Sequence, residues 1–342
     1  MKKITIPLLI ILPLVTFYLL GPRVAEPNLD APIMEPTSNL SQLSVQIELE
    51  EKGNEKIKPD NEARIVWADT SKSKTPYSLV YLHGWSASQE EGDPLHEEIA
   101  ARYGLNLYLT RLSGHGLKEE EPMLDVTATS LMQSARQAIA VGKKLGEKVI
   151  VVATSTGGTM GLYLASQDED IAGLVLYSPN VEIKDGTSVL LNKPWGLQIA
   201  RTVIGGDYHQ WEIDSPRLQY WTNKYRLEAL THLQELVSET MTKETFNAVN
   251  QPVFLGYYYK NEEQQDDVVS VEAMLDMYDQ LGTPDESKVK VAFPEAGHHV
   301  IASHFTSEDL DGVKQETFSF LEDVMGLKAK PSDTTLVSHH SQ

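Results

Sequence analysis

The sequence predicts an α/β protein whose central sheet is mostly parallel and flanked by helices. Short segments rich in β-branched and aromatic residues alternate with segments that carry apolar residues at helical spacing, which is typical of a parallel sheet. Residues 148–154, KVIVVAT, form a continuous apolar run, as expected for a strand buried on both faces. The chain shows no internal repeat.

The first residues, 1–21, are predicted to be a membrane anchor or signal segment. Lys2 and Lys3 precede an uncharged apolar run over residues 4–20, close to the ~17 residues that a short transmembrane helix needs. Arg23 makes a poor cleavage site, which favours an uncleaved anchor over a cleaved signal peptide. The lysines favour a cytoplasmic N-terminus, so we expect a membrane-anchored or exported protein with its main domain outside the cytoplasm.

The remaining chain divides into three parts. Residues 22–56 are a linker and leading segment, 57–326 form the main domain, and the polar residues 327–342 are an expected disordered tail. For residues 41–51, helix and strand both stay open. Strands are expected at residues 63–69, 78–83, 106–112, 148–154, 171–178, 252–259 and 289–293, and helices at 130–145, 158–167, 270–281 and 307–325.

One long connection, residues 180–251, breaks the alternation because no segment in it has convincing strand character. Trp195, Trp211 and Trp221 lie there among helical patterns. A connection of this length is expected to have structure of its own. We therefore expect a helical insertion, over about residues 181–250, that packs over the sheet.

The composition excludes several classes of partner and of reactive site. Asp and Glu number 49 against 29 Lys and Arg, for a formal net charge of −20, which argues against nucleic acid and against a basic face for anionic lipid. The chain contains no cysteine, so a disulfide framework, a thiolate metal site and a cysteine nucleophile are excluded.

Ser155 lies where a predicted buried strand passes abruptly into small residues, in VVATSTGGTM. A serine hydroxyl needs a base to become a nucleophile, and a sharp strand-to-helix turn between small residues lifts it clear of the sheet. Ala153 and Gly157 flank Ser155 at that spacing, and Thr156 would offer its N–H to an oxyanion. The alternative is a serine that caps a helix from a glycine loop.

A second turn, in YLHGWSAS, follows an earlier predicted strand. His83 and Gly84 let the chain turn sharply, which would place the N–H of Trp85 as the other oxyanion donor. An ordinary strand-to-loop turn with a buried Trp85 is the alternative.

Two later loops carry an acid pair and a histidine pair. Asp266 and Asp267 follow one predicted strand, and His298 and His299 end the loop after the last one. No carboxylate or third histidine lies at ligand spacing on the histidine loop, so no metal is expected. The order serine, aspartate, histidine, each after a parallel strand, suits a site at the carboxyl ends of the strands.

With these motifs the chain resembles the α/β-hydrolase superfamily over about residues 57–325, and most of all the bacterial serine esterases and monoacylglycerol-lipase-like hydrolases. The matching motifs are LHGW, RLSGHG, ATSTGG, DDVV and GHHVIAS. The elbow pattern G-x-S-x-G has Ala153 in place of its first glycine, and the chain lacks a His-Gly-Gly-Gly run. The predicted insertion stands where that family carries its cap.

The resemblance implies a triad of Ser155 as nucleophile, Asp266 as orienting acid and His299 as general base. Asp266 is preferred to Asp267 because relatives often read Asp-x-Val-Val. His299 is preferred to His298, although Gly-His is a common signature, because relatives also read His-Val-Ile and the closing helix then follows at the usual distance.

The implied activity is cleavage of a small-molecule carboxylic ester through an acyl-enzyme, with the amides of Trp85 and Thr156 as the oxyanion hole and no cofactor. Two alternatives stay open: a serine peptidase or amidase of the same fold, and a non-catalytic binding protein that kept the fold.

Overall fold

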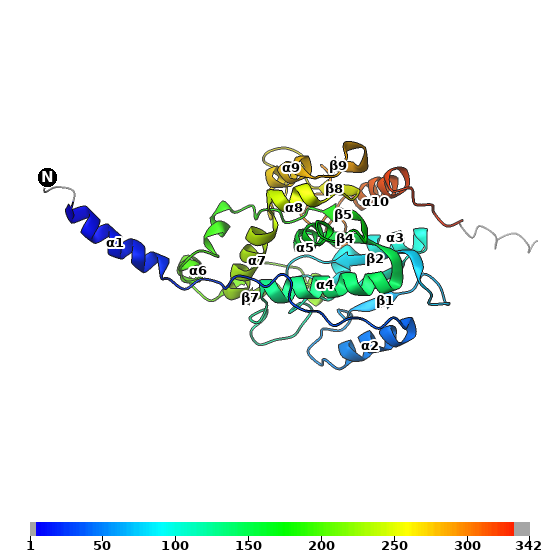
Figure 1. Cartoon of the computed structure of the whole chain (residues 1–342), viewed down its shortest axis with the longest axis horizontal. Helices are drawn as coiled ribbons and strands as arrows, with labels where there is room; N and C mark the ends of the chain where they lie inside the picture. Colours follow the sequence, from blue (N-terminus) through cyan, green and yellow to red (C-terminus); the bar gives the residue numbers. More distant parts are fainter. Residues whose placement is uncertain (1–4, 332–342) are drawn as a thin grey trace, which may run out of the picture.

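The computed structural model describes residues 5–331, in which seven strands form one sheet with helices on both faces (Figure 1). The strands lie in the order β1-β3-β2-β4-β5-β8-β9. Only the edge pair β1–β3 is antiparallel, so the predicted mostly parallel sheet flanked by helices is confirmed. The strands are β1 (Arg64–Val66), β2 (Thr75–Leu82), β3 (Asn106–Leu109), β4 (Gly146–Thr154), β5 (Ile171–Tyr177), β8 (Val253–Tyr257) and β9 (Lys288–Ala292).

Strand β4 divides its side chains between two hydrophobic cores. Val149, Val151 and Ala153 pack into one core, and Ile150 and Val152 pack into the other. The first core is covered by α4 (Ala128–Leu145), α5 (Thr156–Ala165), α8 (Lys243–Ala248) and α9 (Val271–Gln280), and the second by α3 (Leu95–Tyr103) and α10 (Leu310–Ser319). The apolar run of β4 is therefore continuous because both of its faces are buried.

The structure settles one open segment as a helix and changes the end of one expected helix. Residues 41–51, for which helix and strand were both open, belong to α2 (Leu40–Lys52), which buries Leu43 and Ile47 one turn apart. The helix expected over 307–325 is α10, followed by a π-helical turn, Phe320–Val324. A short 3₁₀ turn, Asp285–Ser287, precedes β9.

The insertion between β5 and β8 contains two strands that the sequence did not predict. β6 (Tyr208–Gln210) and β7 (Lys224–Arg226) form an antiparallel pair. Strands of three residues are too short to show a period of two, which explains the wrong prediction. The other elements are the 3₁₀ turns Gly186–Leu190 and Arg217–Gln219, α6 (Gly196–Ile204), α7 (Leu227–Thr240) and α8.

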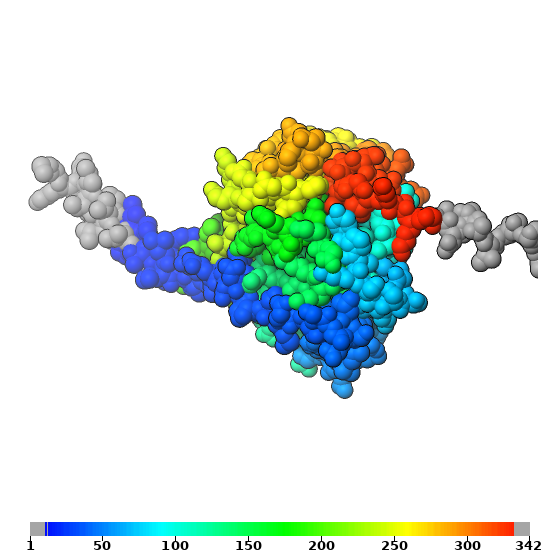
Figure 2. Space-filling view, turned by 45° about the vertical axis from the view of Figure 1, so that its right-hand side comes forward, coloured from blue at the N-terminus to red at the C-terminus, as the bar shows by residue number. Residues whose placement is uncertain are grey.

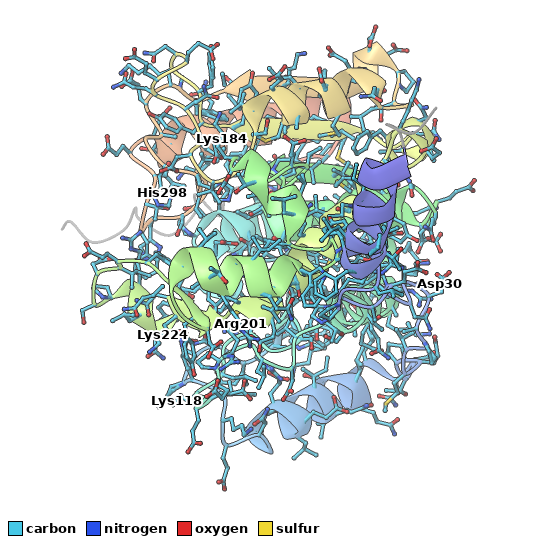
Figure 3. All side chains as sticks on the ribbon, turned by 90° about the vertical axis from the view of Figure 1, so that its left-hand side faces the viewer. Asp30, Lys118, Lys184, Arg201, Lys224 and His298 are labelled. Carbon is cyan, nitrogen blue, oxygen red and sulfur yellow. The ribbon has the colours of Figure 1, made fainter. Side chains whose placement is uncertain are left out.

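Helix α6 stands at the edge of the insertion, whereas α7 packs against α4 and α5. Arg201 of α6, labelled in Figure 3, forms ion pairs with Asp207 and with Glu228 at the start of α7. These pairs connect the outer helix of the insertion to the helix that packs on the body.

The N-terminal helix α1 (Thr5–Leu19) projects from the rounded body (Figures 1 and 2). Among residues 5–331 no helix is long and apolar enough to cross a membrane, so the structure does not support the membrane-spanning helix predicted over 4–20. Phe17 of α1 stacks on Trp195 with ring centroids 4.9 Å apart. Most of the tail predicted over 327–342 lies outside the described residues.

Candidate active site

Ser155 is held on a sharp turn between β4 and α5. Its backbone has φ 52° and ψ −118°, a conformation that residues other than glycine rarely adopt. Two bonds hold the turn: the N–H of Ser155 donates to the carbonyl of Tyr177 over 3.0 Å, and the N–H of Asn180 donates to the carbonyl of Ser155 over 2.9 Å. At Gly157 a Cβ would lie 2.0 Å from the carbonyl oxygen of Leu82, so only glycine lets the turn pack against β2.

Ser155 stands at the N-cap position of α5, but its side chain makes no capping hydrogen bond. The hydroxyl therefore does not perform the structural task that the alternative interpretation assigned to it. Thr156 is the first residue of α5, and the N–H of a first helical residue has no acceptor inside the helix. The turn thus offers a hydroxyl and a neighbouring N–H donor side by side.

The second predicted turn follows β2. The N–H of Leu112 donates to Nε2 of His83, so the ring proton sits on Nδ1, which donates to the carbonyl of Gly84 over 3.0 Å. Burial, and then the neighbouring His115, hold the pKa of His83 well below its usual value, so the ring is neutral. The N–H of Trp85 has no hydrogen-bond partner anywhere in residues 5–331.

Asp266 and His299 come together from the loops after β8 and β9. Nδ1 of His299 lies 2.6 Å from Oδ2 of Asp266, and Oδ1 of Asp266 accepts the N–H groups of Val268 and Val269 over 2.9 and 3.0 Å. Burial alone would raise the pKa of Asp266, but His299 and these N–H donors bring it below its usual value. Asp267 is exposed and does not take this place.

The charge of Asp266 acts on His299 in turn. Burial alone would lower the pKa of His299, but the charge and hydrogen bond of Asp266 outweigh it and raise that pKa. Nε2 of His299 is buried and has no partner among the described residues, and no hydrogen bond joins it to Ser155 there. Such contacts are often long in a free enzyme and tighten when substrate binds.

His298 is engaged differently. Its Nδ1 accepts the N–H of Val300 over 3.0 Å, so the ring supports the backbone of its own loop. Burial, and then the charge of His299, lower the pKa of His298 to about 4. Figure 3 labels this side chain. The structure therefore pairs Asp266 with His299 and not with His298.

A pocket of about 540 Å³ opens beside Ser155, Thr156 and Trp85. Its remaining walls come mostly from apolar side chains of the insertion, among them Leu190, Leu191, Ile199, Ala200, Val203 and Leu230. Tyr225 of β7 also lines the pocket, and its ring meets the edge of Trp85 with centroids 6.0 Å apart. The insertion therefore builds an apolar chamber over the predicted nucleophile.

Potential metal ligands gather at one place in the described part of the chain. Single ligand atoms of Glu90, Asp93 and His304 lie within 4.8 Å of one another, but these partly or fully exposed residues do not line the pocket. Exposed acidic groups commonly gather without a metal, and His304 is already paired with Asp93.

Sequence reasoning missed three residues around the site. Tyr225 lies on a three-residue strand, and Asn180 follows β5 without any motif around it. Glu91 lies in the acidic stretch QEEGDPLHEE, which is typical of a solvated surface, yet it is only 2% exposed. No sequence signal distinguished its burial from the exposure of its neighbours.

The alpha/beta hydrolase family model matches residues 79–313. A thermostable monoacylglycerol lipase of Bacillus sp. (strain H-257) is 32% identical over 170 residues, which cover 49% of this chain and 64% of that relative, less than two thirds of its length.

Two solved structures share the fold. One, from a study of the metagenome-derived lipolytic enzymes LipS and LipT, has a TM-score of 0.59 at 17% identity and covers 78% of this chain and 99% of its own. The monoacylglycerol lipase of Paleococcus ferrophilus has a TM-score of 0.56 at 15% identity and covers 76% and 98%. At these identities the likeness shows the fold alone.

Proposed function

The chain belongs to the alpha/beta hydrolase family, and from this premise we propose that it is a serine hydrolase that cleaves carboxylic esters through an acyl-enzyme. The family membership confirms the resemblance that the motifs predicted, and the lipase and esterase relatives support ester hydrolysis in general. The observation that carries the finer proposal is the 2.6 Å contact of His299 with Asp266, which leaves Nε2 of His299 buried and unpaired.

In the proposed mechanism Ser155 Oγ attacks the ester carbonyl while His299 Nε2 takes its proton. Asp266 stabilises the imidazolium, and the N–H groups of Trp85 and Thr156 bind the developing oxyanion. His299 then gives its proton to the leaving alcohol. A water molecule, activated by the same ring, hydrolyses the acyl-enzyme and regenerates Ser155. These steps require no cofactor.

The apolar chamber favours a substrate with an apolar acyl chain over a polar peptide. A serine peptidase or amidase would use the same three residues, and substrate preference separates the two activities. A non-catalytic binding protein is the weaker alternative, since it would not need Ser155 in a rare backbone conformation with a free hydroxyl. Export out of the cytoplasm stays a prediction.

A fluorophosphonate probe tests the nucleophile. Wild-type protein should be labelled, and S155A should not. H299A should lose labelling and ester hydrolysis, whereas the matched variant H298A should keep both. Labelling of S155A as strong as that of wild type would refute the proposal.

Substrate class is tested with p-nitrophenyl acyl esters of increasing chain length beside aminoacyl p-nitroanilides. Hydrolysis of the esters with little turnover of the anilides is expected. The reverse preference would identify the amidase.

A further inference from the structure

A buried carboxyl that the proposed mechanism does not use lies directly behind the oxyanion turn. Glu91 lies on the 3₁₀ turn Gln89–Gly92 and is 2% exposed. Glutamate is almost never buried so fully without a cationic partner, and Glu91 forms no ion pair within residues 5–331. Its Oε2 instead accepts the N–H of Gly84 over 2.6 Å and the hydroxyl of Tyr81 over 3.2 Å.

Gly84 is wedged between this carboxyl and the predicted nucleophile. A Cβ at Gly84 would lie 2.8 Å from Oε1 of Glu91 and 3.1 Å from Cβ of Ser155. The turn therefore has no room for a side chain, and glycine is the residue whose flanking peptides reorient most easily. A turn built on glycine needs external contacts to hold one orientation.

Two contacts hold the peptides on either side of Gly84. Glu91 binds the N–H of Gly84, and Nδ1–H of His83 binds its carbonyl. That carbonyl and the N–H of Trp85 belong to one planar trans peptide, so they point in opposite directions. Because the Gly84 carbonyl points toward His83, the N–H of Trp85 points away from His83. The hydrogen bond of Glu91 to the Gly84 N–H holds the preceding peptide, so rotation about the backbone bonds of Gly84 cannot undo this orientation.

The same carboxyl is linked to β4, the strand that ends directly before Ser155. The hydroxyl of Tyr81 lies 3.0 Å from Oγ1 of Thr154, the residue before Ser155. Glu91, Tyr81 and Thr154 are all buried. One hydrogen-bonded network thus connects the ends of β2 and β4, the two strands after which the predicted oxyanion donors stand.

We propose that Glu91 is a positioning residue of this hydrolase, whose carboxyl locks the Gly84 turn so that the N–H of Trp85 faces the reacting carbonyl oxygen. The inference rests on the proposed function. Preorganised donors stabilise the transition state more than the ground state, so loss of the lock should lower kcat with little change in KM. If Glu91 served only packing, its replacement would change the stability of the fold and leave kcat and KM unchanged.

The charge of Glu91 provides a second readout. Burial raises the pKa of Glu91 to about 7, and the other groups acting on it are the Gly84 N–H, His299 and Tyr81. His96 of α3 packs against Tyr81 with ring centroids 4.8 Å apart. The charge of Glu91 also helps to raise the pKa of His299. Removal of that charge should therefore move the acidic limb of the pH profile to lower pH.

The experiment compares E91A, E91Q and a control on the full chain with a p-nitrophenyl ester. E91A loses the acceptor, so its kcat should fall at least about tenfold with KM within about threefold. E91Q keeps an acceptor for Gly84, so its kcat at pH 8 should stay within about threefold of wild type while its acidic limb moves to lower pH. The control is E51A, because Glu51 is a partly buried carboxylate whose partners are Arg111 and Ala63. This variant should keep the wild-type kcat.

The inference would be overturned if E91A kept the wild-type kcat. It would also be overturned if E91Q had the low kcat of E91A and its acidic limb did not move. If E91A does not fold, E91M decides, because it fills the buried space but offers no acceptor to Gly84: its kcat should fall at least about tenfold, and an unchanged kcat overturns the inference. S155A separates the two proposals. An active S155A would refute the serine mechanism itself, whereas an inactive S155A beside a fully active E91A refutes the role of Glu91 alone.

Discussion

Nδ1 of His299 lies 2.6 Å from Oδ2 of Asp266, while the other oxygen of this carboxylate is held by two backbone N–H groups. The backbone therefore engages Oδ1 of Asp266, and Oδ2 is left to bind His299. This arrangement fixes the ring and leaves Nε2 as the nitrogen that can accept a proton.

The aspartate pair provides a matched test. D266N should keep the shape of the loop but lower kcat by up to about 10⁴-fold, because an amide stabilises neither the right tautomer nor the imidazolium. D267N should stay near wild type because Asp267 is exposed. Steady-state kinetics on one ester decide this, and equal losses in both variants would contradict the assignment.

Activity should rise with pH through the pKa of His299. The base must be neutral, and Asp266 raises the pKa of the ring above its usual 6.5, so the midpoint of the acidic limb of kcat/KM should lie above pH 6.5. A profile with its midpoint below pH 6.5 would contradict this.

The raised pKa of His299 also makes the free energy of unfolding depend on pH. Because the folded-state pKa of His299 is raised, the pair stabilises the fold fully below about pH 6.5, and this contribution is lost as pH rises through the folded pKa. Urea unfolding of wild type and H299Q across this range measures it. The difference in free energy of unfolding between the two should shrink as pH rises.

Gly157 should tolerate no side chain. A Cβ there would meet the carbonyl oxygen of Leu82 at 2.0 Å, so G157A should lower the free energy of unfolding by about 1–3 kcal/mol or more. Gly206 is the control, because a Cβ there would meet nothing within 4 Å. A urea midpoint for G157A equal to that of G206A would show that the turn can relax.

The pocket wall should set the acyl-chain length. Ala200 lines the chamber, so A200F should lower kcat/KM for a p-nitrophenyl dodecanoate at least about tenfold and leave the acetate nearly unchanged. T202F on the same helix is the control, since Thr202 is exposed and does not line the pocket. If A200F changed kcat/KM equally for both esters, the acyl chain would not lie in this chamber.

The fold could be predicted because strong local patterns and tertiary packing agree. The apolar run of β4 needs two cores, and the structure supplies both. The strands of the insertion could not be predicted, because three residues are too few to show an alternating pattern. β6 and β7 are recognised only by their pairing with each other. For the N-terminal apolar run, no helix among residues 5–331 is long and apolar enough to cross a membrane, and the predicted export stays a prediction.

The sequence could place the candidate site residues relative to the strands, because residue type and position along the chain carry that information. Asp266 and His299 follow β8 and β9, and the parallel sheet brings the ends of its strands to one edge. The choice between neighbouring residues depends on backbone contacts, such as the N–H of Val300 that engages His298. Glu91 escaped prediction because its burial depends on how the chain folds back onto the Gly84 turn, which no pattern in the acidic stretch around it records.

The start of α5 has no side-chain cap, and the proposed substrate would supply an acceptor there. A helix normally completes its first turn with a side chain of its own, but Ser155 leaves that place empty. The proposed oxyanion would accept the N–H of Thr156, the first of the unpaired donors of this helix, so a reversible anionic inhibitor that binds only the folded protein should raise the melting temperature by mass action. In the proposed mechanism α5 stays uncapped between turnovers, and only the reacting substrate supplies the missing acceptor.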